Sequence, residues 1–120
     1  LENSISTTSS NSISAVESKT EIPTVTTSQK NALKRAKEYL KTMPFSYTGL
    51  IEQLEFEQYS HEDAVYAADN CGADWNEQAA KKAQDYLDIM AFSRQGLIDQ
   101  LQFEGYTYEQ AVYGVNQVGL

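Results

Sequence analysis

The stretch Gly49–Tyr59 reads GLIEQLEFEQY, and 47 residues later Gly96–Tyr106 reads GLIDQLQFEGY. The match continues without gaps on both sides. The flanking matches pair Tyr39-Leu40 with Tyr86-Leu87, Phe45-Ser46 with Phe92-Ser93, and Ala64-Val65-Tyr66 with Ala111-Val112-Tyr113. An ungapped self-match at a fixed offset indicates that one structural unit has been duplicated. The two copies fill nearly everything after residue 28.

Composition limits what can stabilise units of this size. The chain has 120 residues, with 17 acidic and 9 basic side chains and a net charge of −8. Two units of about 47 residues each lie close to the lower limit for folding without a disulfide or a metal. The single cysteine, Cys71, excludes an internal disulfide framework, and the single histidine, His61, offers no metal cluster. We therefore expect close helix packing and no metal or other cofactor.

The chain before the repeats has a different composition. Residues 1–27 are dominated by serine and threonine, and their apolar residues follow neither a helical nor a strand period. Such a segment cannot bury an apolar face, so we predict a disordered stalk. It would act as a spacer that holds the repeats away from an anchor, although a dispensable tail is the alternative.

Hydrophobic periodicity predicts three helices in each unit. The first should run from about Ser28 to Thr42, with Thr27 or Ser28 as its N-cap, and Pro44 should end it. Its apolar face consists of Ala32, Ala36, Tyr39, Leu40 and Met43. The next helix should follow Ser46 and carry Leu50, Ile51, Leu54 and Phe56, and a third should follow Ser60. The expected fold is all-α, a tandem of helix-turn-helix-like repeats over residues 28–73 and 74–120.

Turn and cap residues add detail to this plan. Gly105 suits a left-handed position after the second helix, which Gln58 must adopt with strain in the first unit. Gly49 and Gly96 suggest the close approach of another backbone. Three spacings resemble capping boxes: Ser60 with Asp63, Thr107 with Gln110, and Asp74 with Glu77. The short joint around Gly72 predicts a rigid connection between the units.

Several function classes are disfavoured by the residues. A reading helix for DNA should carry basic and amide side chains, but the third helix of the second unit carries no positive charge. Catalysis needs a nucleophile with an adjacent base. His61 occurs in one copy only, and Cys71 replaces a valine of the other copy, which suggests a buried, inert thiol. We expect neither an enzyme nor a nucleic-acid-binding protein.

The repeated motifs resemble a known family. Tyr39-Leu40, Phe45-Ser46, Gly49-Leu-Ile, Leu54-x-Phe-Glu-x-Tyr59 and Asn70-Cys-Gly-Ala-Asp-Trp75 resemble the host-cell-surface-exposed lipoprotein repeat. The resemblance implies a prophage-encoded, superinfection-excluding protein on the outer face of a Gram-positive membrane, with the incoming phage's tail tape-measure protein as its partner. It also implies a lipid anchor in a longer precursor, because the printed chain shows no signal peptide or lipobox cysteine. A wall- or surface-binding module without a phage role and a DNA-binding regulator are the alternatives.

The exposed charges differ between the copies and suggest where a partner binds. Lys30, Lys37 and Lys41 correspond to Glu77, Gln84 and Asp88. Five basic and seven acidic residues give residues 29–73 a net charge of −2, and three against seven give residues 74–120 a net charge of −4. We therefore predict a monomer whose second unit binds a basic partner segment. The predicted contacts are Glu77, Asp85, Asp88 and Asp99, with apolar help from Tyr108 or Trp75. For Trp75, however, packing between the units is the favoured role.

Overall fold

The structure is a computed structural model that describes residues 24–120, where it has six α-helices and no strand. The helices are α1 (Thr27–Thr42), α2 (Tyr47–Phe56), α3 (His61–Asn70), α4 (Trp75–Ile89), α5 (Arg94–Phe103) and α6 (Tyr108–Gln117). The predicted all-α tandem of three-helix units is confirmed. The predicted stalk falls mainly on residues 1–23, outside the described residues. None of the described helices is long and apolar enough to cross a membrane.

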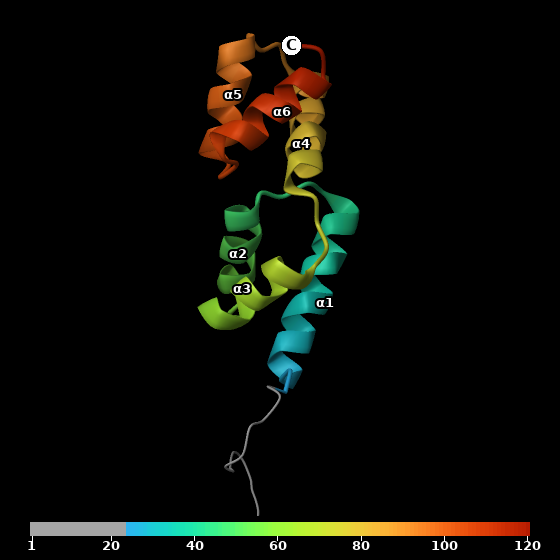
Figure 1. Ribbon diagram of the computed structural model, residues 1–120, viewed down its shortest axis with the longest axis vertical. Coiled ribbons are helices and arrows are strands. Elements are labelled where there is room, and N and C mark those ends of the chain that lie inside the picture. The colour runs from blue at the N-terminus through green and yellow to red at the C-terminus, as the bar shows by residue number, and fades with distance from the viewer. Residues whose placement is uncertain (1–23) are drawn as a thin grey trace, which may run out of the picture.

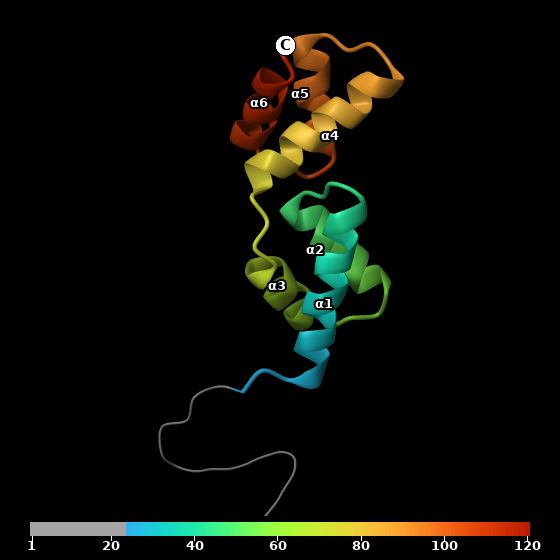
Figure 2. The same cartoon turned by 90° about the vertical axis from the view of Figure 1, so that its right-hand side faces the viewer.

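The two units are stacked end to end along the longest axis (Figures 1 and 2). The first comprises α1–α3 and the second α4–α6, within overall extents of 63 × 25 × 19 Å. In each unit the last helix packs against both of the others, which contact each other much less. Helix-to-helix packing is largely confined to the units, so loops and helix ends make the joint between them.

The start of α1 differs from the prediction. The helix begins at Thr27, and its N-cap is Thr26, whose hydroxyl accepts a hydrogen bond from the Gln29 amide. The Gln29 side chain in turn accepts a hydrogen bond from the Thr26 amide, which completes a capping box. This reciprocal pair outcompetes the predicted caps one and two residues later. The end of α1 is as predicted, with Met43 in an extended conformation before Pro44.

The other predicted caps form, but only one as a complete box. Thr107 and Gln110 exchange both hydrogen bonds, as predicted. Ser60 accepts from the Asp63 amide, whereas the Asp63 carboxylate accepts a hydrogen bond from the Ser28 hydroxyl on α1. Asp74 caps α4 by accepting from two backbone amides. Asp63 therefore links α3 to α1 instead of completing a capping box with Ser60.

The two cores correspond at most positions, although Tyr106 is buried and its counterpart Tyr59 is only half-buried. The first contains Ala32, Ala36, Leu50, Ile51, Leu54, Ala64, Ala67 and Ala68, and the second contains Ala79, Ala83, Leu97, Ile98, Leu101, Tyr106, Ala111 and Val115. At two neighbouring positions the side chains differ in size between the units: Ala67 and Ala68 of the first unit correspond to Gly114 and Val115 of the second. A Cβ atom at Gly114 would lie 2.8 Å from the Ala79 carbonyl, so α6 approaches α4 more closely than a side chain there permits. The larger Val115 fills space next to that contact.

Three apolar residues lie outside the core, contrary to the predicted pattern. Phe56 is 79% exposed and its counterpart Phe103 is 86% exposed, while Met43 is 45% exposed. Leu50, Ile51 and Leu54 already fill the inner face of α2, and a residue two positions after Leu54 points away from that face. Met43 follows the end of α1, where the chain has turned extended. These exposed side chains are therefore available for other contacts.

The repeated glycines at the start of α2 and α5 have a reason different from the predicted one. A Cβ atom at Gly49 would lie 2.8 Å from the Ser46 hydroxyl, and one at Gly96 would lie 2.9 Å from the Ser93 hydroxyl. Each glycine therefore leaves room for its own N-cap serine, which accepts a hydrogen bond from that glycine's amide. Another backbone approaches only Gly49, where the Glu104 carbonyl would be 3.6 Å from a Cβ atom.

The turns after α2 and α5 share one geometry. Gln58 has a φ of +77° and Gly105 a φ of +105°. In each turn the next residue, Tyr59 or Tyr106, donates its amide to the carbonyl of a buried leucine at 3.1 Å. The predicted left-handed conformation of Gln58 is confirmed.

Gln58→Gly should stabilise the chain by about 0.5–1 kcal/mol. A left-handed conformation costs a residue with a Cβ atom about 1–2 kcal/mol, and the greater flexibility of glycine in the unfolded chain offsets part of this gain. Chemical denaturation of the whole chain measures the free energy of unfolding. A decrease in that free energy would contradict the account of this turn.

Gly114→Ala should destabilise the second unit by about 1–3 kcal/mol, because the added methyl group forces α6 away from the backbone of α4. The helix propensity of alanine works in the opposite direction by about 1 kcal/mol. Ala67→Gly at the equivalent position of α3 is the matched control, since it removes a methyl group instead of adding one. Equal stability of Gly114→Ala and the parent in urea denaturation would refute the close contact.

Candidate partner-binding surfaces and the joint between the repeats

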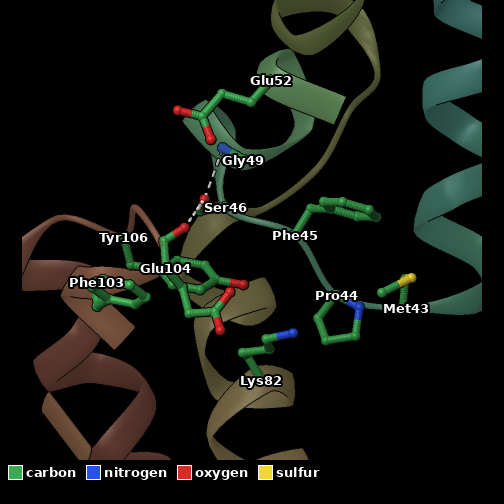
Figure 3. A pocket seen from close by; sticks show the side chains of 10 residues that line it. All are labelled: Met43, Pro44, Phe45, Ser46, Gly49, Glu52, Lys82, Phe103, Glu104 and Tyr106. Atoms are coloured by element: carbon green, nitrogen blue, oxygen red, sulfur yellow. Dashed lines mark hydrogen bonds between the residues drawn. The ribbon is translucent and has the colours of Figure 1, made fainter. Parts of the chain in front are cut away.

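Three hydrogen bonds join the loop between α1 and α2, together with the first turn of α2, to the second unit. The Ser46 hydroxyl donates to the Glu104 carbonyl at 2.7 Å (Figure 3), and the Thr48 hydroxyl donates to the Gly105 carbonyl at 3.2 Å. The Phe45 amide donates to the side-chain oxygen of Gln78 at 2.9 Å. Ser46 is only 3% exposed, so this contact excludes water. The joint is thus made by polar groups with defined directions.

Gln78 links the two sides of this joint. Its side chain is buried and accepts from the first unit, while its backbone carbonyl accepts from the Tyr106 hydroxyl at 3.2 Å. Burial, together with the nearby carboxylates of Glu104 and Asp85, raises the pKa of Tyr106 far above its ordinary value of 10. The hydroxyl therefore keeps its proton and remains a donor.

Trp75 packs between the units, which confirms the favoured sequence interpretation. Although it is the first residue of α4, its ring packs against the core of the first unit. It meets Tyr47 edge to face, with ring centroids 5.6 Å apart. Trp75 is partly buried by this contact, so its role as an apolar partner anchor is not favoured.

A small cavity of about 280 Å³ lies beside the joint. Figure 3 shows the α1–α2 loop on one side and Phe103, Glu104 and Lys82 on the other. Its lining consists of Met43, Pro44, Phe45, Ser46, Gly49, Glu52, Lys82, Phe103, Glu104 and Tyr106. The lining of the cavity therefore combines polar and apolar side chains, and Phe103 is the most exposed aromatic side chain in it.

The predicted acidic face of α4 is present. Glu77, Asp85 and Asp88 are exposed and fall at i, i+8 and i+11, so they share one side of the helix. Asp85 also lies next to the joint, where it lines a groove of about 250 Å³ together with Lys41 and Lys81. The ion pairs in residues 24–120 all belong to the first unit, joining Arg35 to Glu38 and Glu57, and His61 to Glu55. The three α4 carboxylates are free of such pairing.

Asp99 and Tyr108 belong to a different surface. They lie on α5 and α6, and their counterparts in the first unit are Glu52 and His61. Those two counterparts line a groove of about 460 Å³ between α2 and α3. By the repeat, Asp99 and Tyr108 face the equivalent side of the second unit, where both are exposed. The five predicted contact residues therefore divide into an α4 set and an α5–α6 set.

A family model described as host cell surface-exposed lipoprotein matches residues 27–71 and residues 74–118. The chain belongs to this family. The two matches correspond to the two three-helix units, and the resemblance inferred from the repeated motifs is confirmed.

Among solved structures, the chain is similar to that of Ltp, a superinfection exclusion protein from the Streptococcus thermophilus temperate phage TP-J34. The two chains are 35% identical, with a TM-score of 0.71, over 83% of this chain and 99% of the other. The curated proteins contain no match. The similarity covers essentially all of Ltp, so it concerns the whole arrangement of two repeats.

This member of the lipoprotein family carries a repeated polar network that sequence reasoning missed. In the first unit the Tyr39 hydroxyl contacts the Glu57 carboxylate and accepts from Gln53 at 3.1 Å. Tyr86, Glu104 and Gln100 make the same arrangement in the second unit. All three residue types recur at the offset of 47, which was the available signal. The acids at 57 and 104 therefore fasten the first helix of each unit to the turn between the next two.

The first network has an additional charge partner. Arg35 donates two hydrogen bonds to the Glu57 carboxylate, at 2.9 and 3.0 Å, and its guanidinium lies 4.3 Å from the centre of the Tyr39 ring. These hydrogen bonds from Arg35 hold the pKa of Glu57 below its ordinary value of 4.5. In the second unit Lys82 takes the place of Arg35, with its ammonium group 5.8 Å from the centre of the Tyr86 ring.

The described residues include one free thiol and no metal-binding cluster. Within residues 24–120 no group of three or more His, Cys, Asp or Glu side chains is placed to hold a metal ion. Cys71 is half-buried, and its thiol donates to the Ala68 carbonyl at 3.4 Å. The absence of catalysis stays a prediction, and the arrangement favours binding.

The free energy of unfolding should decrease as the pH falls through the lowered pKa of Glu57. A carboxyl group whose pKa is lower in the folded chain binds fewer protons there than in the unfolded chain. Its contribution is therefore fully present above pH 4.5 and is lost below it. Arg35→Gln should flatten this part of the pH dependence, measured by urea denaturation between about pH 6 and pH 3. Lys82→Gln, the matched change in the second unit, should leave it unaltered; an equal effect of both variants would contradict the role of Arg35.

Proposed function

We propose that this chain is the exposed part of a prophage-encoded surface lipoprotein that excludes superinfecting phages. It would block DNA injection by binding the tail tape-measure protein of the incoming phage. The observation that carries this proposal is the similarity to Ltp, at 35% identity over nearly all of that chain. The match of both repeats to a surface-exposed lipoprotein family supports a location outside the cell. A lipid on a longer precursor would provide the anchor on a Gram-positive membrane.

The charge of the chain favours a basic partner. The net charge of −8 disfavours nucleic acid, because phosphates would be repelled. A basic polypeptide segment released from a phage tail would instead be attracted to the second unit, whose exposed acids on α4 form no ion pair within residues 24–120. We assign the primary contact to Glu77, Asp85 and Asp88, because these three residues share one face.

Electrostatics alone would not hold such a partner. An exposed ion pair contributes about 0.2–1 kcal/mol, so three pairs orient a partner more than they retain it. Apolar contacts must supply the remaining binding energy. Tyr108, which is 56% exposed, and Asp99 could reach a segment only if it extended from α4 around to the α5–α6 side. Because salt screens exposed pairs, the affinity should decrease as ionic strength rises.

Binding to the cell wall or another surface component without a phage role is the second candidate. The surface-exposed family description is compatible with it. A wall-binding module would retain its ligand in uninfected cells, whereas a superinfection-excluding protein protects cells only when a phage attacks. A pull-down with phage tail proteins and one with purified cell walls distinguish the two candidates.

The double variant Glu77→Lys and Asp88→Lys should lose protection against infection. It changes two acids of the second unit to the residue type found at the equivalent positions of the first unit, Lys30 and Lys41. Both positions are exposed, so the helical circular dichroism and the unfolding midpoint should stay near those of the parent. Plaque formation on cells expressing the full lipidated precursor measures protection, and a tape-measure pull-down measures binding.

A charge-matched control separates this face from net charge. Glu52→Lys with Glu62→Lys makes the same change in total charge at two exposed positions of the first unit. This control should bind and protect like the parent. If the α4 variant protects as well as the parent, the acidic-face mechanism is wrong. If both double variants lose protection equally, net charge rather than the α4 face is responsible.

A further inference from the structure

The contact between the repeats is heterologous, because its two sides are different surfaces of the repeated unit. The donor side is the loop at the end of the first helix, with Phe45, Ser46 and Thr48. The acceptor side is the turn at Glu104 and Gly105 together with Gln78. A heterologous contact can in principle be repeated without limit, producing a longer array or a filament. Within residues 24–120, each unit therefore bears one unused half of the contact.

The unused donor side of the second unit keeps most of the required residues. Met43, Phe45, Ser46 and Gly49 correspond to Met90, Phe92, Ser93 and Gly96. Ser93 caps α5 just as Ser46 caps α2, by accepting from the following glycine amide at 3.0 Å. Ser93 is nevertheless exposed, and Ile89 and Met90 beside it are 76% and 55% exposed. This loop is a docking surface with nothing docked on it in residues 24–120.

The unused acceptor side of the first unit is blocked. A Cβ atom at Gly105 would lie 2.7 Å from the Ser46 hydroxyl and closer still to the Thr48 hydroxyl. Both hydroxyls are held by their own hydrogen bonds on short side chains, so they cannot move aside cheaply. The equivalent position of the first unit carries the whole side chain of Gln58. A serine loop therefore cannot approach this turn as Ser46 approaches Gly105.

Two further substitutions oppose repetition of the contact. Gln78 corresponds to Asn31, which is one methylene shorter and cannot reach the same amide. Thr48 corresponds to Gln95, whose side chain donates to Asp99 at 2.9 Å rather than projecting a short hydroxyl. Each change removes one of the three hydrogen bonds or the space that they need. Phe103 and Glu104 are matched by Phe56 and Glu57, whereas Tyr47 and Trp75, which pack together at the joint, correspond to Arg94 and Ser28.

We infer that Gln58, supported by Asn31 and Gln95, prevents head-to-tail association of this chain, and that the loop Met90–Ser93 would dock on the corresponding turn of a second copy if that turn carried glycine at position 58. The native chain is then a monomer with a retained but unmatched docking surface. This inference does not depend on the proposed function, because it concerns contacts between repeats only.

The triple variant Asn31→Gln, Gln58→Gly and Gln95→Thr restores, at the two free faces, the residues that make the three hydrogen bonds of the joint. Sedimentation velocity over a wide concentration range should show the native chain at 13.4 kDa throughout. The triple variant should at least double its weight-average mass at high concentration, because head-to-tail contacts can then form. Circular dichroism establishes that the variant is folded, and the Gln58→Gly change favours folding by itself.

Adding Ser93→Asp to the triple variant is the matched control. Aspartate still caps α5, but its carboxylate cannot donate to a carbonyl and would repel it. This quadruple variant should return to the monomer mass. The inference is overturned if the folded triple variant stays at 13.4 kDa, if the native chain associates, or if the Ser93→Asp control still associates.

Discussion

The relative placement of the two repeats depends on one hydroxyl group, that of Ser46. It accepts the Gly49 amide at 2.9 Å to cap α2, which leaves its own proton to donate to the Glu104 carbonyl at 2.7 Å. The helix cap fixes the position of the hydroxyl inside the first unit, so the contact with the second unit inherits that geometry. A buried group that serves both purposes leaves little freedom for either unit to rotate. The bonds from Thr48 and Phe45 fix the remaining directions.

Sequence reasoning succeeded where the signal is local or repeated. The spacing of apolar residues, together with Pro44 and the N-cap serines, predicted where the helices lie. The comparison of Gln58 with Gly105 predicted the strained turn from the sequence alone. Sequence reasoning failed where the burial of a side chain depends on which other side chains already fill the core. Phe56 and Phe103 look like core residues by composition, but three smaller side chains already fill the inner face of their helices. The reason for Gly49 and Gly96 also emerged only from the distance to the serine hydroxyls.

The candidate site shows the same division. The predicted acids are all exposed, as a solvated helix face requires, but their grouping was not visible from charge alone. The repeat pairs Asp99 and Tyr108 with Glu52 and His61, but only the structure shows that these two counterparts share a groove on the first unit. The joint had no comparable signal. Ser46 and Ser93 both follow a phenylalanine and both cap a helix with glycine three residues later, yet only Ser46 is buried, by a residue 58 positions away.

The matched cores explain how the surfaces of the two units could diverge. Each unit is stabilised by nearly the same small set of alanine, leucine and isoleucine side chains, and the exchange of Ala67 and Ala68 for Gly114 and Val115 adds only one side-chain carbon to it. Exposed charges contribute little to this stability, so Lys30 and Lys41 can become Glu77 and Asp88 at small cost. The joint then makes equivalent positions unequal, since Phe103 borders a cavity between the units while Phe56 does not. A duplicated scaffold can thereby present two different surfaces. The first helix of the second unit, α4, has an acidic face, whereas its counterpart α1 carries lysines at the corresponding positions 30 and 41.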